Sequence, residues 1–242
     1  MLRNYLRRTY QAAMEQAYQS ARRTIAENYR PGMRLLDCGA YTGKEFELLQ
    51  QFGAIPAEAY TGIEWSLPEV EIARAKGLDV IQGDLNRPLP FADASFDCVY
   101  ALSVLEHLVN GCSWIREVHR VLRPGGLFVL LTPNIATYFT AVQVLLGRMP
   151  STGPHPDSNA LAATNAYELN DAAIATEGDT PVHRHMVVFS FGALRDYLEL
   201  AGFAEVSGRG FGHYPAPLFL QPLLQRIDAG HCHQMVFTAR KP

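Results

Sequence analysis

The sequence predicts a doubly wound α/β fold with a mostly parallel sheet. Three observations lead to this prediction: short apolar runs alternate with helical stretches, several runs end in an acid, and residues 127–131 are apolar throughout. A continuous apolar run is typical of a strand buried on both faces of a parallel sheet. Strands that alternate with helices at this spacing indicate βαβ units.

The elements follow one another along the chain in this alternation. Strands are expected at residues 33–37, 60–64, 78–82, 96–102, 127–131, 203–208 and 234–239. Helices are expected at residues 1–29, 44–52, 66–77, 113–122, 135–146 and 190–201. Gly and Pro residues follow the first, third, fourth and last of these helices, which favours an end at each point.

Serine or threonine residues mark the expected helix starts. A Ser or Thr followed three residues later by Glu is a capping box, which determines where a helix begins. The sequence has three such pairs, Thr42/Glu45, Ser66/Glu69 and Ser103/Glu106. Ser190 is a further expected N-cap.

Composition favours one core with an added helical arm. The chain has 242 residues, of which 48% are hydrophobic and 19% charged, enough for one sizeable core. We expect an N-terminal arm at residues 1–30 and a domain at 31–242. Within that domain, the proline-rich residues 133–189 are expected to form an inserted lid or substrate wall, because so long an irregular insertion is usually functional.

Charge limits the partners that the chain could bind. The net charge of −3 provides no general basic field, so nucleic acid is not expected as a partner. The arm is locally rich in arginine, which suits a solvated helix face or contact with a membrane surface or lipid-linked substrate. The oligomeric state is left open.

The cysteines and apolar segments indicate a cytoplasmic protein without a metal. None of the four cysteines forms a C-x-x-C pair, so neither a zinc site nor an iron–sulfur site is indicated. This usage is typical of a reducing compartment. No leader-like run and no apolar segment of ~18 residues is present.

Polar residues gather where the predicted strands end. In an open α/β sheet, ligands bind at the carboxyl ends of the strands. Glu64 ends the second strand and could take both hydroxyls of a ribose. Asp84 follows the third strand and could accept a hydrogen bond from an adenine amine, while Trp65 or Leu85 could cover a purine face. These residues predict a nucleoside site.

The turn after the first strand limits which class of cofactor the chain could bind. Gly39 and Gly43 lack a Cβ and let a ligand approach the backbone. The dinucleotide pattern G-x-G-x-x-G fails here, because Tyr41 and Lys44 occupy its second and third glycine positions. The phosphate-loop pattern fails as well, because the glycine spacing is one residue too short. A cofactor without phosphates is therefore favoured.

On these residues the chain resembles the class I S-adenosylmethionine-dependent methyltransferases, in the branch that acts on small molecules. The motifs that carry the resemblance are Asp37–Gly43, Glu64, Asp84, the strand and turn from Phe96 to Leu108, and the run from Glu117 to Gly126. Tyr41 departs from the pattern, because the family usually has a glycine there. The resemblance implies a seven-stranded sheet whose last strand is antiparallel.

The resemblance also implies the site residues. S-adenosyl-L-methionine would contact Asp37, Gly39, Ala40, Tyr41, Gly43, Glu64, Trp65, Asp84, Leu85, Ala101, Leu102 and Ser103. Asp37 would hold the turn and the methionine ammonium, and Tyr41 would narrow the space beside it. Candidate catalytic residues are His107, His183 and His185, because a neutral imidazole can take the acceptor's proton.

The expected acceptor is a small molecule such as a saccharide, a lipid-linked intermediate or a secondary metabolite, with oxygen slightly preferred over nitrogen. One alternative is a noncatalytic relative that binds the cofactor as a partner subunit. Another is a nucleic-acid methyltransferase. Its amino-directed members usually place Asn or Asp with two prolines after the fourth strand, where this chain has Ala101-Leu102-Ser103.

Overall fold

One seven-stranded sheet organises the protein. The computed structural model describes residues 2–156, 158 and 184–242, and its strands lie in the order β3-β2-β1-β4-β5-β7-β6. The strands are β1 (Leu35–Cys38), β2 (Tyr60–Glu64), β3 (Val80–Gln82), β4 (Phe96–Leu102), β5 (Leu122–Pro133), β6 (Ala204–Phe211) and β7 (Gln234–Arg240). The first five pair in parallel, and β7 runs antiparallel between β5 and β6. The predicted fold class is confirmed.

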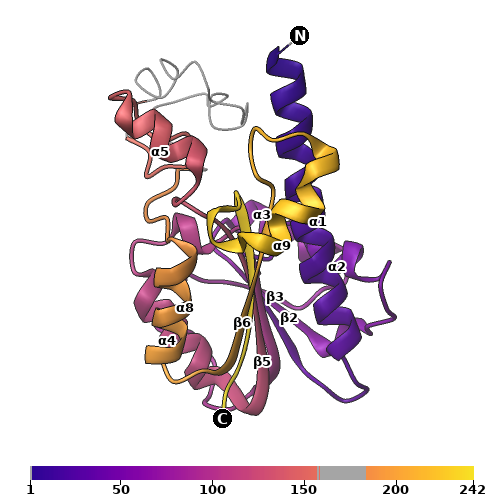
Figure 1. Ribbon diagram of the computed structural model, residues 1–242. Helices are drawn as coiled ribbons and strands as arrows, with labels where there is room; N and C mark the ends of the chain where they lie inside the picture. Colours follow the sequence, from indigo (N-terminus) through magenta and orange to yellow (C-terminus); the bar gives the residue numbers. More distant parts are fainter. Residues whose placement is uncertain (1, 157, 159–183) are drawn as a thin grey trace.

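Helices cover both faces of the sheet (Figure 1). They are α1 (Leu2–Asn28), α2 (Lys44–Leu49), α3 (Leu67–Ala75), α4 (Gly111–Val121), α5 (Tyr138–Leu145), α8 (Phe191–Leu200) and α9 (Gln221–Ile227). Figure 1 shows α1 and α2 on one side of the sheet and α4 and α8 on the other. Helix α5 continues the chain beyond the carboxyl end of β5.

Two apolar layers result from the alternation of side chains along each strand. Leu36 and Cys38 of β1 belong to the core cluster that includes Trp114 of α4 and Leu194 of α8. Leu35, which precedes Leu36 and faces the opposite side of the sheet, belongs to the cluster on the α1 side. Because β1 is buried on both faces, its short run contains no exposed residue.

Helix α1 packs onto the sheet through small side chains. Ala13, Ala17, Ala21 and Ile25 recur every four residues and are at most 5% exposed. This spacing places them on one face of the helix. Alanine at three of the four positions keeps that face narrow, so α1 can lie close against the strands.

The first predicted capping box is wrong. Helix α2 begins after Gly43, which adopts φ 77°, and no side chain caps it. Glu45 instead accepts hydrogen bonds of 2.8 and 3.0 Å from the guanidinium of Arg22 on α1. The local pattern predicted that the Glu45 carboxylate would cap α2 together with Thr42. It instead forms an ion pair with Arg22, which joins α2 to α1.

The other two boxes also fail. Ser66 precedes α3, but its side chain makes no capping hydrogen bond. Ser103 adopts φ 58°, and Glu106 lies in the 3₁₀ turn Leu105–His107 well before α4 begins. The expected cap at Ser190 is confirmed, because its hydroxyl accepts from the N–H of Ala193 at 3.2 Å.

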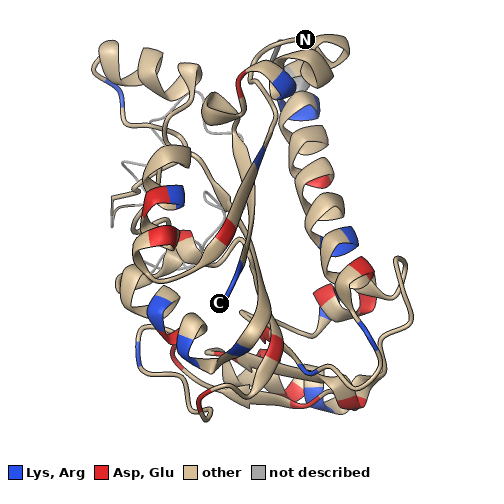
Figure 2. Cartoon of the chain, turned by 60° about the horizontal axis from the view of Figure 1, so that its bottom comes forward, with Lys and Arg blue, Asp and Glu red and all other residues tan. Residues whose placement is uncertain are grey.

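Charge is dispersed over the described residues. In Figure 2, basic and acidic positions are interspersed along α1 and spread over several helices and loops. Among the helices that the structure describes, none combines the length and the apolar character needed to cross a membrane.

Candidate active site

The turn after β1 is held against the end of β2. The N–H groups of Gly39 and Ala40 donate to the carbonyl of Ile63 at 2.9 and 3.1 Å. Gly39, Tyr41 and Gly43 have φ values of 84°, 47° and 77°, in the left-handed region that glycine adopts without strain. Tyr41 adopts this conformation with a side chain that is 53% exposed. The ring therefore lies largely in solvent in this structure.

Gly39 is also required by packing. A Cβ at this position would lie 2.5 Å from Cγ2 of Val104, just beyond the end of β4. The turn after β1 and the segment after β4 are therefore in close contact. Because the strand order reverses between β1 and β4, this contact lies at the switch point of the sheet, where such folds bind ligands.

The Glu64 carboxylate is a hydrogen-bonding centre beneath the turn. One oxygen accepts from the N–H of Tyr41 at 3.0 Å, and the other accepts from the N–H groups of Trp65 and Ser66 at 2.9 and 3.0 Å. Its residue is 9% exposed. The predicted ribose acid thus lies at the carboxyl end of β2 and also fixes the backbone of the β1 turn.

Asp37 is buried beneath the turn. Its residue is 2% exposed, and its carboxylate accepts a hydrogen bond of 3.0 Å from the hydroxyl of Tyr60. Burial raises the pKa of Asp37 to about 7, although the hydrogen bond from Tyr60 opposes the shift. In this structure the carboxylate supports the sheet beneath the turn.

The residues after β2 and β3 differ in exposure. Trp65 is 73% exposed, whereas Leu85 is 8% exposed and belongs to the core. Only Trp65 therefore presents an accessible apolar face. Asp84 accepts hydrogen bonds from the backbone and side-chain nitrogens of Asn86, and it lies 3.5 Å from Arg87.

The end of β4 contacts the N-terminal helix. Ala101 and Leu102 are buried, and the Ser103 hydroxyl accepts a 2.9 Å hydrogen bond from the hydroxyl of Tyr18 on α1. Burial raises the pKa of Tyr18 to about 12, with a smaller contribution from the nearby Glu106 carboxylate. No local pattern in the sequence indicates this hydrogen bond, which joins residues 85 positions apart.

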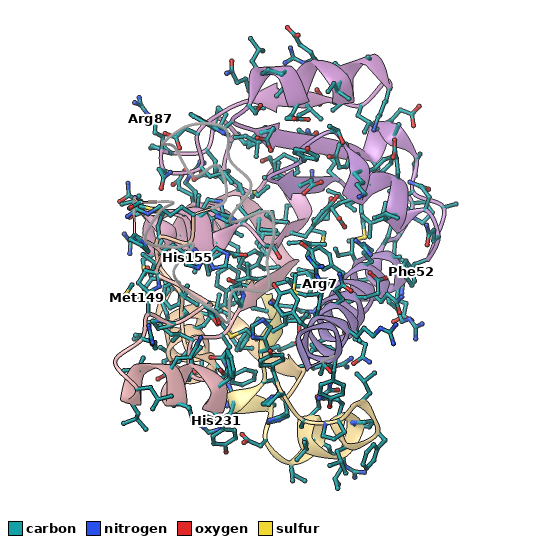
Figure 3. The ribbon with its side chains drawn as sticks, turned by 90° about the horizontal axis from the view of Figure 1, so that it is seen from above. Arg7, Phe52, Arg87, Met149, His155 and His231 are labelled. Carbon is teal, nitrogen blue, oxygen red and sulfur yellow. The ribbon has the colours of Figure 1, made fainter. Side chains whose placement is uncertain are left out.

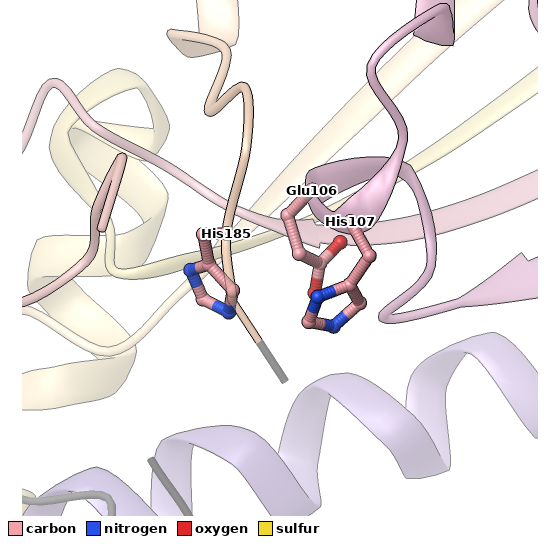
Figure 4. A group of neighbouring side chains, drawn as sticks. All are labelled: Glu106, His107 and His185. Atoms are coloured by element: carbon pink, nitrogen blue, oxygen red, sulfur yellow. The ribbon is translucent and has the colours of Figure 1, made fainter. Parts of the chain in front are cut away.

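A second polar cluster lies just beyond Ser103. It consists of Glu106, His107 and His185, whose candidate ligand atoms lie within 4.8 Å of one another. Figure 4 shows the three side chains side by side, two from the 3₁₀ turn and one from the segment before α8. The structure brings His107 and His185 together, with their ring centroids 5.1 Å apart. His183 lies outside the described residues.

Burial controls protonation in this cluster. It raises the pKa of Glu106 to about 7, against the opposing hydrogen bonds from its own backbone and from Thr132. It lowers the pKa of His107, and it lowers that of His185 to about 3. Both imidazoles are therefore uncharged at neutral pH and can each present a lone pair.

His155 extends the cluster. Its ring centroid lies 4.8 Å from that of His185, and its Nδ1 accepts from the backbone N–H of His185 at 3.2 Å. The sequence could not pair His155 with His185, because no local pattern links the two segments. Figure 3 looks down on this end of the molecule, with α1 on one side and the segment of Met149 and His155 on the other.

A groove of about 630 Å³ lies between α1 and α2. Its walls are side chains of α1 from Tyr10 to Arg22 and of the α2 region from Lys44 to Phe52. None of the predicted cofactor residues lines it. The groove and the strand ends are therefore separate features, although Tyr18 belongs to the first and contacts the second.

Part of the chain is similar to known methyltransferases. The family model described as a methyltransferase domain matches residues 36–130. A probable S-adenosylmethionine-dependent methyltransferase of Mycolicibacterium smegmatis is 35% identical over 109 residues, which is 44% of this chain and 40% of that protein. The ubiquinone biosynthesis O-methyltransferase of Ruegeria pomeroyi is 30% identical over 168 residues, which is 66% of this chain and 64% of that protein.

A third relative differs in its named acceptor. The "Probable tRNA methyltransferase 9B" of Bos taurus is 33% identical over 111 residues, 45% of this chain and 23% of that protein. This chain thus covers between 23% and 64% of the length of these three relatives.

Solved structures share the fold over nearly the whole chain. A methyltransferase of Thermotoga maritima, described as a possible histamine N-methyltransferase, has a TM-score of 0.57 at 17% identity, with 99% of both chains covered. The structure of a complex between the Haloferax volcanii Trm112 methyltransferase activator and a methyltransferase has a TM-score of 0.58 at 16% identity. The match covers 99% of this chain and 95% of the matched chain. At such identities the likeness concerns the fold alone.

Proposed function

We propose that this chain, whose residues 36–130 match the family model of a methyltransferase domain, transfers a methyl group from S-adenosylmethionine to a small-molecule acceptor, with oxygen slightly preferred over nitrogen. The observation that carries the proposal is the position of Glu64. Its carboxylate lies at the carboxyl end of β2 and is bonded to the N–H of Tyr41 in the glycine turn. The acid and the turn thereby form one unit at the switch point.

The residues present fit the cofactor chemically. The Glu64 carboxylate can accept both ribose hydroxyls, and the Asp84 carboxylate can accept from the adenine amine. Trp65 is exposed and can cover the purine face. The turn of Asp37, Gly39, Ala40, Tyr41 and Gly43 would hold the methionine end, with Ala101, Leu102 and Ser103 bordering it.

The reaction mainly requires that the protein align the methyl group of the cofactor with the acceptor atom. S-adenosylmethionine supplies a methyl group on a reactive sulfonium, so the protein contributes proximity and orientation, worth up to ~7–11 kcal/mol in favourable cases. Residues beyond Ser103 would contact the acceptor. His107 and His185 are uncharged at neutral pH, since burial lowers the pKa of both, and either could accept a hydrogen bond from a hydroxyl group. With a pKa of about 3, His185 is a weak base, so His107 is the better candidate for accepting the proton.

Two arguments support an oxygen acceptor. The relatives include enzymes named as O-methyltransferases, such as that of Ruegeria pomeroyi. The cluster beyond Ser103 also offers imidazole lone pairs, which suit a hydroxyl that must lose its proton.

The proposal keeps a saccharide, a lipid-linked intermediate or a secondary metabolite as acceptor. It also keeps residues 133–189 as the substrate wall and residues 1–30 as an arm that could meet a membrane or lipid-linked substrate.

Calorimetry and an acceptor screen test the function. The purified chain should bind S-adenosylmethionine and S-adenosylhomocysteine, and Glu64→Ala should weaken both by tenfold or more, on the order of 1.4 kcal/mol. Turnover is followed by S-adenosylhomocysteine release with panels of hydroxylated and aminated small molecules. Absence of binding to either nucleoside would reject the cofactor site. Binding without turnover on any acceptor would favour a noncatalytic partner subunit.

Transfer RNA is a second candidate acceptor, favoured by the relative named as a tRNA methyltransferase. The dispersed charge of the described residues argues against it (Figure 2), since nucleic-acid binding normally requires a clustered basic face. Filter binding with total tRNA at two salt concentrations would decide between the two. Salt-sensitive retention together with methyl incorporation would replace the small-molecule assignment.

A further inference from the structure

Glu106, His107 and His185 form a donor set typical of a divalent cation site. One ligand-type atom from each lies within 4.8 Å of the others, and they come from two distant segments of the chain. Two imidazoles and one carboxylate occur together in catalytic zinc sites. Imidazole nitrogen also favours zinc and neighbouring transition metals over magnesium or calcium.

Hydrogen bonds to the backbone orient both imidazoles. Nδ1 of His107 lies 3.0 Å from the carbonyl oxygen of Arg184, and Nδ1 of His185 lies 2.6 Å from that of Thr152. A carbonyl oxygen can only accept, so each Nδ1 carries the proton and each Nε2 carries the lone pair. Metal-binding histidines usually donate their other ring N–H in this way.

The carboxylate is oriented by a similar contact. Oε2 of Glu106 accepts a 2.8 Å hydrogen bond from the hydroxyl of Thr132 on β5. Glu106 is 2% exposed, and a carboxyl group buried to this degree is normally paired with a charge, coordinates a metal or holds a proton. Among the contacts that the described residues make, no positively charged side chain is bonded to it, so a proton or a metal ion would balance its charge.

The backbone holds the two segments together without an ion. The N–H groups of Met186 and Val187 both donate to the carbonyl of Glu106, at 2.6 and 3.3 Å. The segment of His185 is thereby attached to the 3₁₀ turn that carries the other two residues. The cluster is therefore largely arranged in advance, which reduces the conformational cost of binding.

We propose that Glu106, His107 and His185 bind one divalent transition-metal ion of the zinc type. Ligand bonds of about 2.1 Å would place the donor atoms about 3.4 Å apart in a tetrahedral site, so donor atoms that now lie within 4.8 Å of one another would draw closer on binding. Three protein ligands leave at least one position open. On the proposed function, this position would hold an oxygen atom of the acceptor, next to Ser103 and the cofactor.

Direct metal titration tests the site. The full chain, freed of metal with a chelator, is titrated with zinc chloride by calorimetry and with cobalt chloride by visible absorption. One equivalent of each should bind, and cobalt should develop the absorption bands of a low-coordinate site. His185→Ala and Glu106→Gln should each weaken zinc binding by tenfold or more, because even the loss of a residue that only orients a metal ligand typically costs about 10–100-fold in affinity.

A matched variant controls for other histidines. His231→Ala removes an imidazole that pairs with Asp228 at 2.7 Å, outside the cluster, and should leave zinc affinity unchanged. Circular dichroism melts show whether each variant is folded. If Glu106→Gln does not fold, His185→Ala decides alone, because its residue lies in an irregular segment.

Two outcomes would overturn the inference: no stoichiometric binding to the wild-type chain, or equal zinc affinity in the wild type and folded His185→Ala. S-adenosylhomocysteine binding is measured on the same wild-type sample. Nucleoside binding without zinc binding rejects only the metal site. Zinc binding without nucleoside binding rejects the proposed function and leaves the metal site standing.

Discussion

The backbone N–H of Tyr41 donates a 3.0 Å hydrogen bond to the side-chain carboxylate of Glu64. This contact joins the turn after β1 to the end of β2, two elements that are adjacent in the sheet. Because the other carboxylate oxygen accepts from Trp65 and Ser66, Glu64 orders three backbone groups. A residue expected to bind ribose therefore also shapes the turn beside it.

Replacing Glu64 with glutamine should weaken cofactor binding by about tenfold or more, on the order of 1.4 kcal/mol. Glutamine keeps the size of the side chain but replaces one acceptor oxygen with a donor group, so it cannot satisfy both Tyr41 and the ribose. Calorimetry with S-adenosylhomocysteine measures the change. Glu71→Gln, at an exposed position on α3, is the control, and equal affinity in the two variants would contradict the role of Glu64.

Replacing Tyr41 with glycine should leave the free energy of unfolding within about 1 kcal/mol of the wild type. The left-handed conformation costs a non-glycine residue roughly 1–2 kcal/mol, and the gain from relieving it offsets the added freedom of the unfolded chain. Cofactor affinity should change by less than about threefold, on the order of 0.6 kcal/mol, because glycine keeps the backbone N–H that joins this position to Glu64.

The comparison variant for this position is Tyr41→Val. A β-branched residue with φ near 47° is strongly disfavoured, so urea denaturation should show a clear loss of stability. A large drop in cofactor affinity in Tyr41→Gly would instead indicate that the tyrosine ring contacts the ligand.

Replacing Glu45 with alanine should lower the free energy of unfolding by roughly 2 kcal/mol, because Glu45→Ala leaves the Arg22 guanidinium without its main partner. The Arg22 side chain is 8% exposed and that of Glu45 is 21% exposed. Glu47→Ala on the same helix is the matched control. The Glu47 side chain, which is 53% exposed, pairs with Lys76. Exposed ion pairs contribute at most about 1 kcal/mol to the free energy of unfolding. Similar unfolding free energies for the two variants would contradict this account of how α1 is attached.

Asp37 should make the protein less stable as pH rises. Burial raises its pKa from 3.8 in the unfolded chain to about 7 in the fold. Between these values the folded state binds more protons, so the unfolding free energy falls with pH by up to about 1.4 kcal/mol per pH unit. The contribution is complete below pH ~4 and is lost as pH passes ~7.

The matched variant is Asp37→Asn, whose amide oxygen can still accept from Tyr60. Urea denaturation at pH 5 and pH 8 should show a smaller loss of stability in this variant than in the wild type. Asp196→Asn, at an exposed position on α8, should follow the wild type. An equal decline in Asp37→Asn and the wild type would show that Asp37 does not titrate in this range.

The elements of the sheet were predictable because their signals are local. The apolar run at residues 127–131 lies within β5 and is buried on both faces of the sheet. Ser190 caps α8 as expected, since it competes with no distant partner. The motifs around Asp37, Glu64 and Asp84 likewise occupy the ends of β1, β2 and β3, because parallel strands place their carboxyl ends at one edge.

Local patterns failed where a distant residue competed for the same group. Glu45 fits a capping box, but the guanidinium of Arg22 offers its carboxylate a charged, two-point partner. Glu106 also fits a capping box, but it is buried and bonded to Thr132 on another strand. The short-range pattern was present in both cases, and a stronger tertiary contact replaced it.

By itself, the sequence determined the order of strands and helices, the glycine turn and the acids at the strand ends, since these depend on neighbours along the chain. Only the tertiary structure decided that Tyr18 donates to Ser103 and that His185 lies beside Glu106 and His107. Such contacts join residues far apart in the chain. They depend on where α1 crosses the sheet and where the segment before α8 returns to it, and no periodicity in the sequence encodes either position.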